Sequence, residues 1–435
     1  MSFVKELVQS SGEAYTACRP NAIHRDGITY IGFIIRSVNG CYITCYKHST
    51  KEWGSMALLG TASGMDEHHN VGIGFLPNGK LIAFFGMHEN SMRWKVSTYT
   101  HAQIKADPYK ISEWSSEKNK SGLYTYPCVM SFADKVVVFH RKNVSNYYYI
   151  VMSSTVDGDN FTAEVTITAQ LPNVLDTSYL WASLVNGKII LAGYLWTETP
   201  HTYTNLYYAY SDDEGDTWKK VNGSALSVPF FNDAKVLDSI HSTRAIGATL
   251  DENGKPIMWY IFKTGGGVTG DYNLKLAIYS AVLGQSGTWS IYNAIDENNN
   301  PILTGYNDFP DPFISLHEGR YTLYVRAKYD SSFYVTRFCR KAGFANKFDT
   351  VWKDTYLSVT AFIQMCYVWN KEAGCDFEAV LGEWDGSKRV LYARGIESGG
   401  GEPPEPPLGE PTRIIGVHRI PQSGRKQYII LPRPV

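Results

Sequence analysis

The stretch VNGKIILAGYLW at residues 185–196 is the clearest of a set of similar segments in this chain. A short apolar run leads into Asn-Gly, and a strand-forming run follows. Asn-Gly between two such runs indicates a β-hairpin, because a type I′ turn needs positive φ at both central residues. The pattern recurs at RDGITYIGFIIR (25–36), PNGKLIAFFGMH (77–88), ADKVVVFHR (133–141), ENGKPIMWYIFK (252–263), HEGRYTLYVRAK (317–328) and, in weaker form, AGCDFEAVLGEW (373–384).

The spacing of these hairpins predicts the fold. Successive turns are 52 to 67 residues apart, at Gly27, Gly79, Asp134, Gly187, Gly254, Gly319 and Gly374. Another β-rich run follows each hairpin, as in TNLYYAYS or NLKLAIYS. Four short strands per repeat of ~50 residues are typical of a propeller blade. We therefore predict an all-β fold, a seven-bladed β-propeller of four-stranded antiparallel blades, over residues 1–396. The best candidates for short helices are the stretch from Val4 to Ser10 and the stretch from His101 to Ala106.

One turn carries a motif of its own. SDDEGDTW at 211–218 matches the Asp-box of bacterial-neuraminidase-type repeats, and STVDGDNF at 154–161 keeps the same spacing in degenerate form. We expect the carboxylate and Gly215 to close a tight turn while Trp218 packs between blades. The motif is structural, so it supports the fold and carries no chemistry.

The composition changes after Ile396. ESGGGEPPEPPLGEPT favours a linker over residues 397–412, because Pro and Gly interrupt helices and central strands. Residues 413–435 contain two apolar runs around a basic turn, which is compatible with a hairpin as a short C-terminal extension. The sequence leaves open whether this tail folds back on the propeller or contacts a partner or larger assembly.

Charge and composition exclude several classes. The chain has 435 residues with 41 Lys+Arg against 42 Asp+Glu, which argues against a nucleic-acid partner. No apolar stretch is long enough for membrane insertion. The start lacks a secretory signal pattern, which favours a cytoplasmic or virion-associated protein, or a secreted one if the sequence is trimmed. The seven cysteines include no CxxC pair, so we expect buried free thiols.

A repeated structural position predicts the binding face. In a propeller, the start of each innermost strand and the end of the next strand meet on one face. Cations and aromatic residues recur at these positions, which suits an acidic sugar chain as the ligand. The predicted substrate-binding residues are Arg36, His69, Asn70, Tyr179, Trp181, Trp196, Arg244, Lys263 and Lys328.

The densest cluster of polar residues consists of DEHHN (66–70), GMHEN (86–90), TYP (125–127) and FHR (139–141). It offers His, Tyr and Arg but no obvious carboxylate pair, which a glycoside hydrolase would usually need. β-Elimination at a uronate needs a base, an acid and a group that neutralises the carboxylate, and these residue types can supply all three. The register of the strands predicts that His68, His88, Tyr126 and Arg141 converge on one face.

The same segments resemble a known family. DEHHN followed by GFLPNGKLIAFFGMH looks like the DDHNN and LPDGRxLAFYSxH pattern of the BNR-4 repeat family, and TYP with VVVFHR looks like its SYPN and LYLFxRG segment. That family includes seven-bladed ulvan lyases, and the resemblance spans roughly residues 20–395. The resemblance implies a uronate-specific polysaccharide lyase whose predicted catalytic residues are those at the motif positions, His68, His88, Tyr126 and Arg141.

The chain departs from the motif at several places. His69 stands where the motif has Asn, Val71 replaces its Pro, Cys128 replaces the Asn after Tyr-Pro, and FHRK replaces the FxRG ending. The sequence leaves open whether Tyr126 or His88 is the base.

Two other functions remain open from the sequence. The same cationic face would serve a non-catalytic glycan-binding propeller, for example one on a virus particle. A sialidase-like glycoside hydrolase shares the Asp-box, but its Arg-Ile-Pro motif occurs here only at 419–421, beyond the linker. No metal site is predicted, because adjacent His68 and His69 would point to opposite faces of a strand. We expect no catalytic cofactor, while a structural metal ion stays open.

Overall fold

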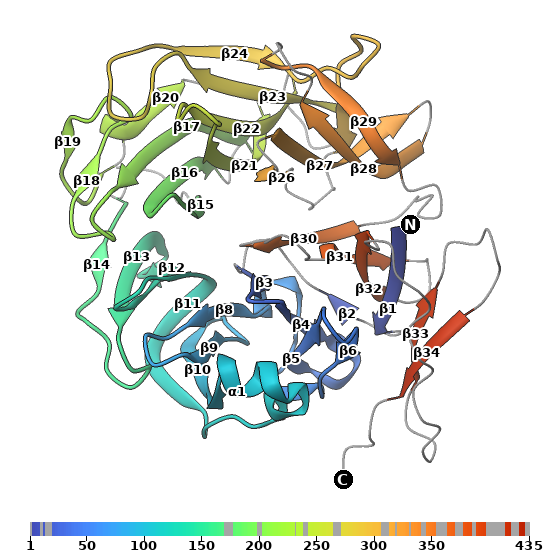
Figure 1. Cartoon of the computed structure of the whole chain (residues 1–435). Coiled ribbons are helices and arrows are strands. Elements are labelled where there is room, and N and C mark those ends of the chain that lie inside the picture. Colours follow the sequence, from blue (N-terminus) through green and yellow to red (C-terminus); the bar gives the residue numbers. More distant parts are fainter. Residues whose placement is uncertain are drawn as a thin grey trace. The chain divides into compact units, whose positions relative to one another are not determined.

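A computed structural model of the chain describes residues 2–8, 12–13, 20–168, 177–197, 202–230, 232–237, 242–263, 271–305, 313–317, 320–329, 332–340, 345–353, 363–369, 377–384, 389–396, 414–418 and 426–430 (Figure 1). These residues form antiparallel sheets, apart from one parallel pair. The chain divides into two compact units, which are described separately. The first unit is Met1–Val136, Ser154–Phe161 and Ile363–Val435, and the second is Val137–Ser153 and Thr162–Phe362.

The first unit contains a twelve-stranded sheet with the order β34-β33-β1-β32-β31-β30-β3-β4-β5-β6, from which β2 and β7 branch. β3 pairs in parallel with β30. The strands are β1 (Ser2–Val8), β2 (Gly12–Glu13), β3 (Ala22–Arg25), β4 (Ile28–Ile35), β5 (Gly40–Lys47), β6 (Glu52–Trp53), β7 (Ala57–Thr61), β30 (Ile363–Trp369), β31 (Phe377–Trp384), β32 (Arg389–Ile396), β33 (Ile414–His418) and β34 (Lys426–Ile430).

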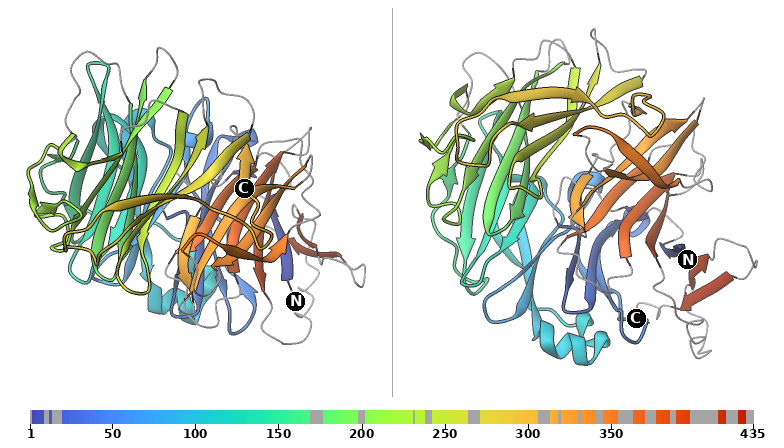
Figure 2. Two further views of the ribbon diagram at one scale, coloured as in Figure 1. Left: turned by 90° about the horizontal axis from the view of Figure 1, so that it is seen from above. Right: turned by 45° about the horizontal axis from the view of Figure 1, so that its top comes forward.

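The first unit also holds the strands that carry the site. In order along their sheet they are β8 (Gly72–Phe75), β9 (Lys80–Phe84), β10 (His88–Thr100) and β11 (Lys118–Ser131). The short helices are η1 (Arg36–Val38), η2 (Glu67–His69), α1 (His101–Ala106) and η3 (Pro108–Ser112). Figure 2 shows α1 and η3, in cyan, in two further views.

The second unit repeats an antiparallel pattern. β26 (Phe313–His317), β27 (Arg320–Tyr329), β28 (Ser332–Arg340) and β29 (Phe348–Lys353) form a four-stranded sheet, the arrangement predicted for a blade. The remaining strands are β12 (Val136–Val144), β13 (Tyr147–Thr155), β14 (Val165–Thr166), β15 (Thr177–Val185), β16 (Lys188–Thr197), β17 (Thr202–Ser211), β18 (Trp218–Lys219), β19 (Ala225–Leu226), β20 (Lys235–Leu237), β21 (Ser242–Leu250), β22 (Pro256–Lys263), β23 (Asp271–Tyr279), β24 (Trp289–Asn293) and β25 (Leu303–Gly305), with η4 (Asn232–Ala234).

The strands of the predicted hairpins pair as expected, but the described turns differ, and Gly319 and Gly374 lie outside the described residues. Asp26–Gly27 and Asn186–Gly187 have positive φ at both residues, as expected for type I′. At Gly79 and Gly254 only the glycine has positive φ. There the amides of Gly79 and Gly254 donate to the carbonyls of Leu76 and Asp251. This is a three-residue loop, in which a type I turn precedes a left-handed glycine.

The two predicted helices have different outcomes. His101–Ala106 is helical, and Thr100 caps it by accepting a hydrogen bond from the amide of Gln103. The described part of the stretch from Val4 to Ser10 is not a helix, because Ser2–Val8 forms strand β1, while Gln9 and Ser10 lie outside the described residues. This strand pairs antiparallel with β32, beginning with Ser2 opposite Ile396. It also pairs with β33, which lies in the C-terminal tail. Pairing with distant segments therefore overrides the local helical pattern.

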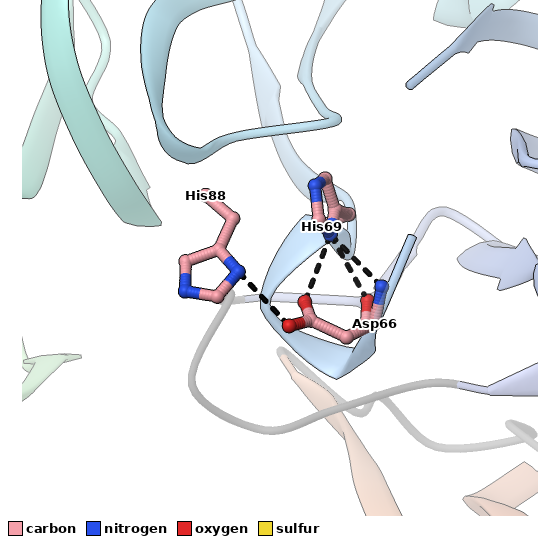
Figure 3. A group of neighbouring side chains, drawn as sticks. All are labelled: Asp66, His69 and His88. Carbon is pink, nitrogen blue, oxygen red and sulfur yellow. Dashed lines mark hydrogen bonds and ion pairs between the residues drawn. The ribbon is translucent and has the colours of Figure 1, made fainter. Parts of the chain in front are cut away.

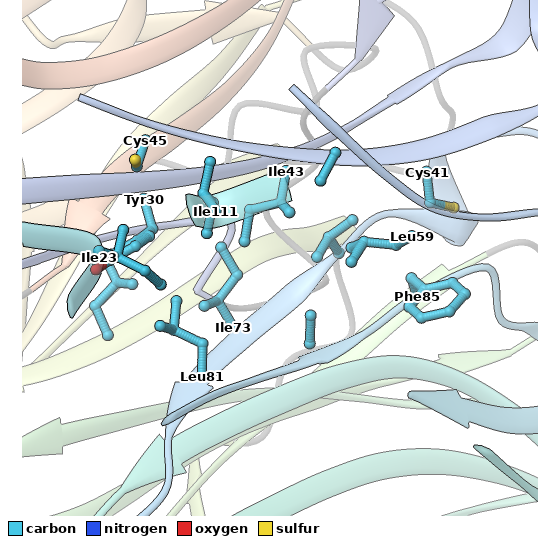
Figure 4. Packing of buried hydrophobic residues seen from close by; sticks show 14 of the residues in the cluster. Ile23, Tyr30, Cys41, Ile43, Cys45, Leu59, Ile73, Leu81, Phe85 and Ile111 are labelled. Atoms are coloured by element: carbon cyan, nitrogen blue, oxygen red, sulfur yellow. The ribbon is translucent and has the colours of Figure 1, made fainter. Parts of the chain in front are cut away.

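The core of the first unit lies between its sheets (Figure 4). All eight residues of β4 are buried, which explains its continuous apolar run. Tyr30, Ile43, Leu59 and Ile73 are fully buried within this cluster. The prediction of buried cysteines outside disulfides is confirmed for Cys41, Cys45 and Cys128, which form no disulfide in the described part of the chain.

The Asp-box forms the predicted turn. The hydroxyl of Ser211 accepts a hydrogen bond from the Gly215 amide at 2.8 Å, and Oδ1 of Asp213 accepts one from the Thr217 amide at 2.8 Å. Trp218 is buried and packs against Phe139 and Phe230. The motif therefore closes a turn and anchors an aromatic side chain in the second unit.

Candidate active site

Asp66 organises the DEHHN segment. Its carboxylate caps η2 by accepting a hydrogen bond from the His68 amide at 3.0 Å. Nδ1 of His69 lies 3.0 Å from the Asp66 amide nitrogen, in the position of a capping box, and 2.8 Å from Oδ1 of the Asp66 carboxylate. Because the two histidines lie in a 3₁₀ turn and not on a strand, the prediction that they face opposite sides is wrong. Both rings reach the same carboxylate.

The loop before β10 brings His88 to this turn. The Gly86 amide donates to the His69 carbonyl at 2.9 Å, and Gly86 has φ +67°. Nδ1 of His88 then lies 2.9 Å from Oδ2 of Asp66 (Figure 3). The His88 ring stacks on the His68 ring with centroids 4.0 Å apart and planes 12° apart.

Tyr126 reaches the same place from β11. His88 pairs with Thr125 across the strands, and the register shifts before Asn90. Glu89 and Tyr126 both have left-handed backbones, with φ 52° and 57°. Such a conformation costs roughly 1–3 kcal/mol for a residue with a side chain, and strain of this kind is often found at functional sites. The Tyr126 ring centroid lies 5.3 Å from that of His68.

The structure thus brings together three of the four predicted catalytic residues, His68, His88 and Tyr126. Arg141 belongs to the second unit, where it is buried on β12 with its guanidinium 4.8 Å from the Tyr148 ring centroid. Its approach to the other three stays a prediction.

The predicted substrate-binding residues fall into three groups. His69 and Asn70 are almost fully buried, so contact with a polysaccharide would require them to be uncovered. Arg36 directly follows β4 and is partly buried. For the others only the backbone is described, and their side chains lie outside the described part: Tyr179 and Trp181 on β15, Trp196 on β16, Arg244 on β21, Lys263 on β22 and Lys328 on β27.

The electrostatics of the site centre on Asp66. Burial alone would raise the pKa of this carboxyl, but hydrogen bonds from His68, His69 and His88 outweigh burial and hold the pKa far below its usual range. Asp66 is therefore an anion at neutral pH. Asp66 was not among the site residues predicted from the sequence, although an Asp three positions before His69 fits an N-cap signal.

Asp66, His69 and His88 are also where a metal ion could be held. Among the described residues, their ligand-type atoms lie within 4.8 Å of one another. However, the Asp66 carboxylate is 2.8 Å from Nδ1 of His69 and 2.9 Å from Nδ1 of His88. Ligands around a tetrahedral Zn²⁺ are separated by roughly 3.3 Å, given bonds of about 2.0–2.1 Å. The observed separations fit hydrogen bonds better.

The fold and site together define a class, an all-β protein of the propeller type with His and Tyr side chains gathered on capped turns and strand ends. The chain belongs to the BNR repeat-containing family, which it matches over residues 28–297. The predicted family is therefore confirmed. No helix in the described part of the chain is long and apolar enough to cross a membrane.

Known relatives support this membership. An ulvan lyase from Alteromonas sp. (strain LOR) is 22% identical over 242 residues, which are 48% of this chain and 50% of that protein. The match thus spans about half the length of this relative. Two solved structures of a PL25 ulvan lyase, one bound to -[GlcA(1-4)Rha3S]-, match with TM-score 0.70 at 15% identity, covering 91% of this chain and 96% of theirs. This similarity confirms the propeller fold, while the number of blades stays a prediction.

Proposed function

We propose that this protein is a polysaccharide lyase that cleaves an acidic, uronate-containing polysaccharide by β-elimination. The proposal rests on the proximity of His68, His88 and Tyr126. The ring centroid of His68 lies 4.0 Å from that of His88 and 5.3 Å from that of Tyr126. The relative named as an ulvan lyase supports the reaction class. The PL25 structure bound to -[GlcA(1-4)Rha3S]- supports a sulfated uronate polymer as the substrate class.

The chemistry requires three roles. A base removes the proton on carbon 5 of the uronate, the electron pair forms the C4–C5 double bond, and the C4–O bond breaks as an acid protonates the leaving oxygen. His88 and Tyr126 are the proposed acid–base pair. Arg141 is proposed to neutralise the uronate carboxylate, which stabilises the negative charge that develops during proton removal.

The direct test is incubation with a panel of uronate polysaccharides while the ultraviolet absorbance of the unsaturated product is followed. His88→Ala and Tyr126→Phe should each lower kcat about 10²- to 10⁴-fold. Arg141→Ala should lower it roughly 10²- to 10³-fold. Tyr109→Phe is the matched control, since Tyr109 is exposed on η3, away from this cluster, and should stay fully active.

Other outcomes separate the alternatives. New reducing ends without the unsaturated product would indicate a hydrolase. Binding to the panel without turnover would indicate a glycan-binding protein, and either result would contradict the proposal.

A further inference from the structure

The Asp66 carboxylate contacts both sides of the site. Oδ2 faces Nδ1 of His88 at 2.9 Å, while Oδ1 faces Nδ1 of His69 at 2.8 Å. The side chains of Asp66 and His88 are 28% and 32% exposed, whereas that of His69 is 4% exposed. Asp66 therefore links a buried imidazole to one that solvent can reach.

The hydrogen-bonding roles follow from the donor inventory. An ionised carboxylate only accepts hydrogen bonds, so Nδ1 of His88 has to carry a proton to bond with Asp66. In a neutral imidazole the other nitrogen, Nε2, then has a free lone pair. Figure 3 shows this second ring nitrogen of His88 turned away from Asp66.

His69 holds the carboxylate in place. Its carbonyl accepts hydrogen bonds from the Gly86 amide at 2.9 Å and from the Cys41 thiol at 3.3 Å. The buried turn is thus tied to both β5 and the β9–β10 connection. The BNR-4 pattern that this segment resembles has Asn where this chain has His69.

We propose that Asp66 is a positioning residue that fixes the orientation and the Nδ1–H tautomer of His88, with His69 as its anchor. This inference rests on the proposed function, and it assigns Nε2 of His88 as the proton acceptor. His88 then takes the proton from carbon 5, and Tyr126 donates its hydroxyl proton to the leaving oxygen. Proton exchange with water restores both groups.

The first experiment needs no activity. Two-dimensional NMR of the full chain labelled with ¹⁵N-histidine reports which ring nitrogen of each imidazole carries the proton. We expect His88 to be the Nδ1–H tautomer in the native protein and to lose this single tautomer in Asp66→Asn. An Nε2–H tautomer of His88 in the native protein would overturn the proposal. The NMR experiment tests the role of Asp66 even if no polysaccharide is cleaved. A lack of cleavage would contradict only the proposed function.

The second experiment measures kinetics. Asp66→Asn should lower kcat roughly 10²- to 10⁴-fold, by analogy with carboxylates that orient a catalytic imidazole. KM should change less than about threefold, because Asp66 acts through His88. Glu117→Gln is the matched control. Glu117 is a partly exposed carboxylate that bonds Arg93, so this variant should keep its kcat. An unchanged kcat in folded Asp66→Asn would overturn the proposal.

A third variant covers the case in which Asp66→Asn does not fold. His69→Asn restores the motif residue and keeps Asp66, so we expect it to fold, with a kcat lowered less than about tenfold and the His88 tautomer retained. Loss of that tautomer together with full activity would contradict the proposed role. Metal analysis of the purified native protein and of Asp66→Asn is the last check, since a tightly bound ion that the native protein holds and Asp66→Asn lacks would mean that this cluster binds a metal.

Discussion

The imidazole of His68 lies parallel to that of His88, with centroids 4.0 Å apart, and both rings face the carboxylate of Asp66. The two residues come from η2 and β10, which the Gly86–His69 hydrogen bond ties together. One acidic side chain thus connects the two histidines predicted to be catalytic, and its state should affect both stability and turnover.

Acid should reveal the contribution of Asp66 to stability. The pKa of Asp66 in the folded protein lies well below the unfolded value of about 3.9, so the stabilisation is fully present well above that value and is lost progressively as pH falls through and below it. The native protein should therefore exceed Asp66→Asn in unfolding free energy at neutral pH, and the gap should shrink in acid. Urea unfolding at several pH values measures this. Asp134→Asn, at an exposed turn, is the control, and a gap that grows in acid would contradict the prediction.

The Asp-box should contribute to stability through Asp213 and not through its neighbour. Asp213→Ala removes the acceptor for the Thr217 amide and should cost about 1–3 kcal/mol. Asp212→Ala is the matched control, because its ion pair with Lys219 lies on the surface, where solvent screens the attraction and the pair contributes little to stability. Denaturant midpoints of the two variants give the comparison. Equal losses would show that the motif does not act through this turn.

Close packing between β8 and β11 should make Gly74 intolerant of a side chain. A Cβ at Gly74 would lie 2.6 Å from Cγ1 of Val129. Gly74→Ala should therefore destabilise by about 1–3 kcal/mol. Adding Val129→Ala removes the clashing methyl group, so the double variant should lose less than the sum of the single changes. Thermal unfolding of all three variants tests this coupling, and simple additivity would refute it.

The buried thiols should be unreactive in the native state. Burial raises the pKa of Cys41 to about 12, and that of Cys45 to about 12. The thiolate is the reactive form, so both should alkylate with iodoacetamide at mildly basic pH only after unfolding. Mass spectrometry of native and urea-treated samples measures the labelling. Rapid modification of native Cys41 would contradict the burial of the His69 turn, to which its thiol donates.

The sequence by itself determined the features that depend on neighbouring residues. Asn-Gly and Asp-Gly turns specify hairpins because few residues adopt positive φ, and the Asp-box closes on itself within eight positions. The repeat of these units predicted the propeller fold, and the resemblance of the DEHHN, GMH and TYP segments to a known motif pattern predicted the family. The motif residues His68, His88 and Tyr126 followed from the register of the hairpins.

Only the tertiary structure decided what depends on distant contacts. Ser2–Val8 is a strand because β32, almost 400 positions away, supplies its hydrogen bonds. His68 and His69 share one carboxylate because Asp66 caps a 3₁₀ turn, whereas an alternating strand pattern would separate them. Asp66 contacts His88 because the hydrogen bond from the Gly86 amide to the His69 carbonyl holds the start of β10 against that turn. Periodicity in a sequence reports which face a residue occupies, but the partner across that face is set by long-range packing.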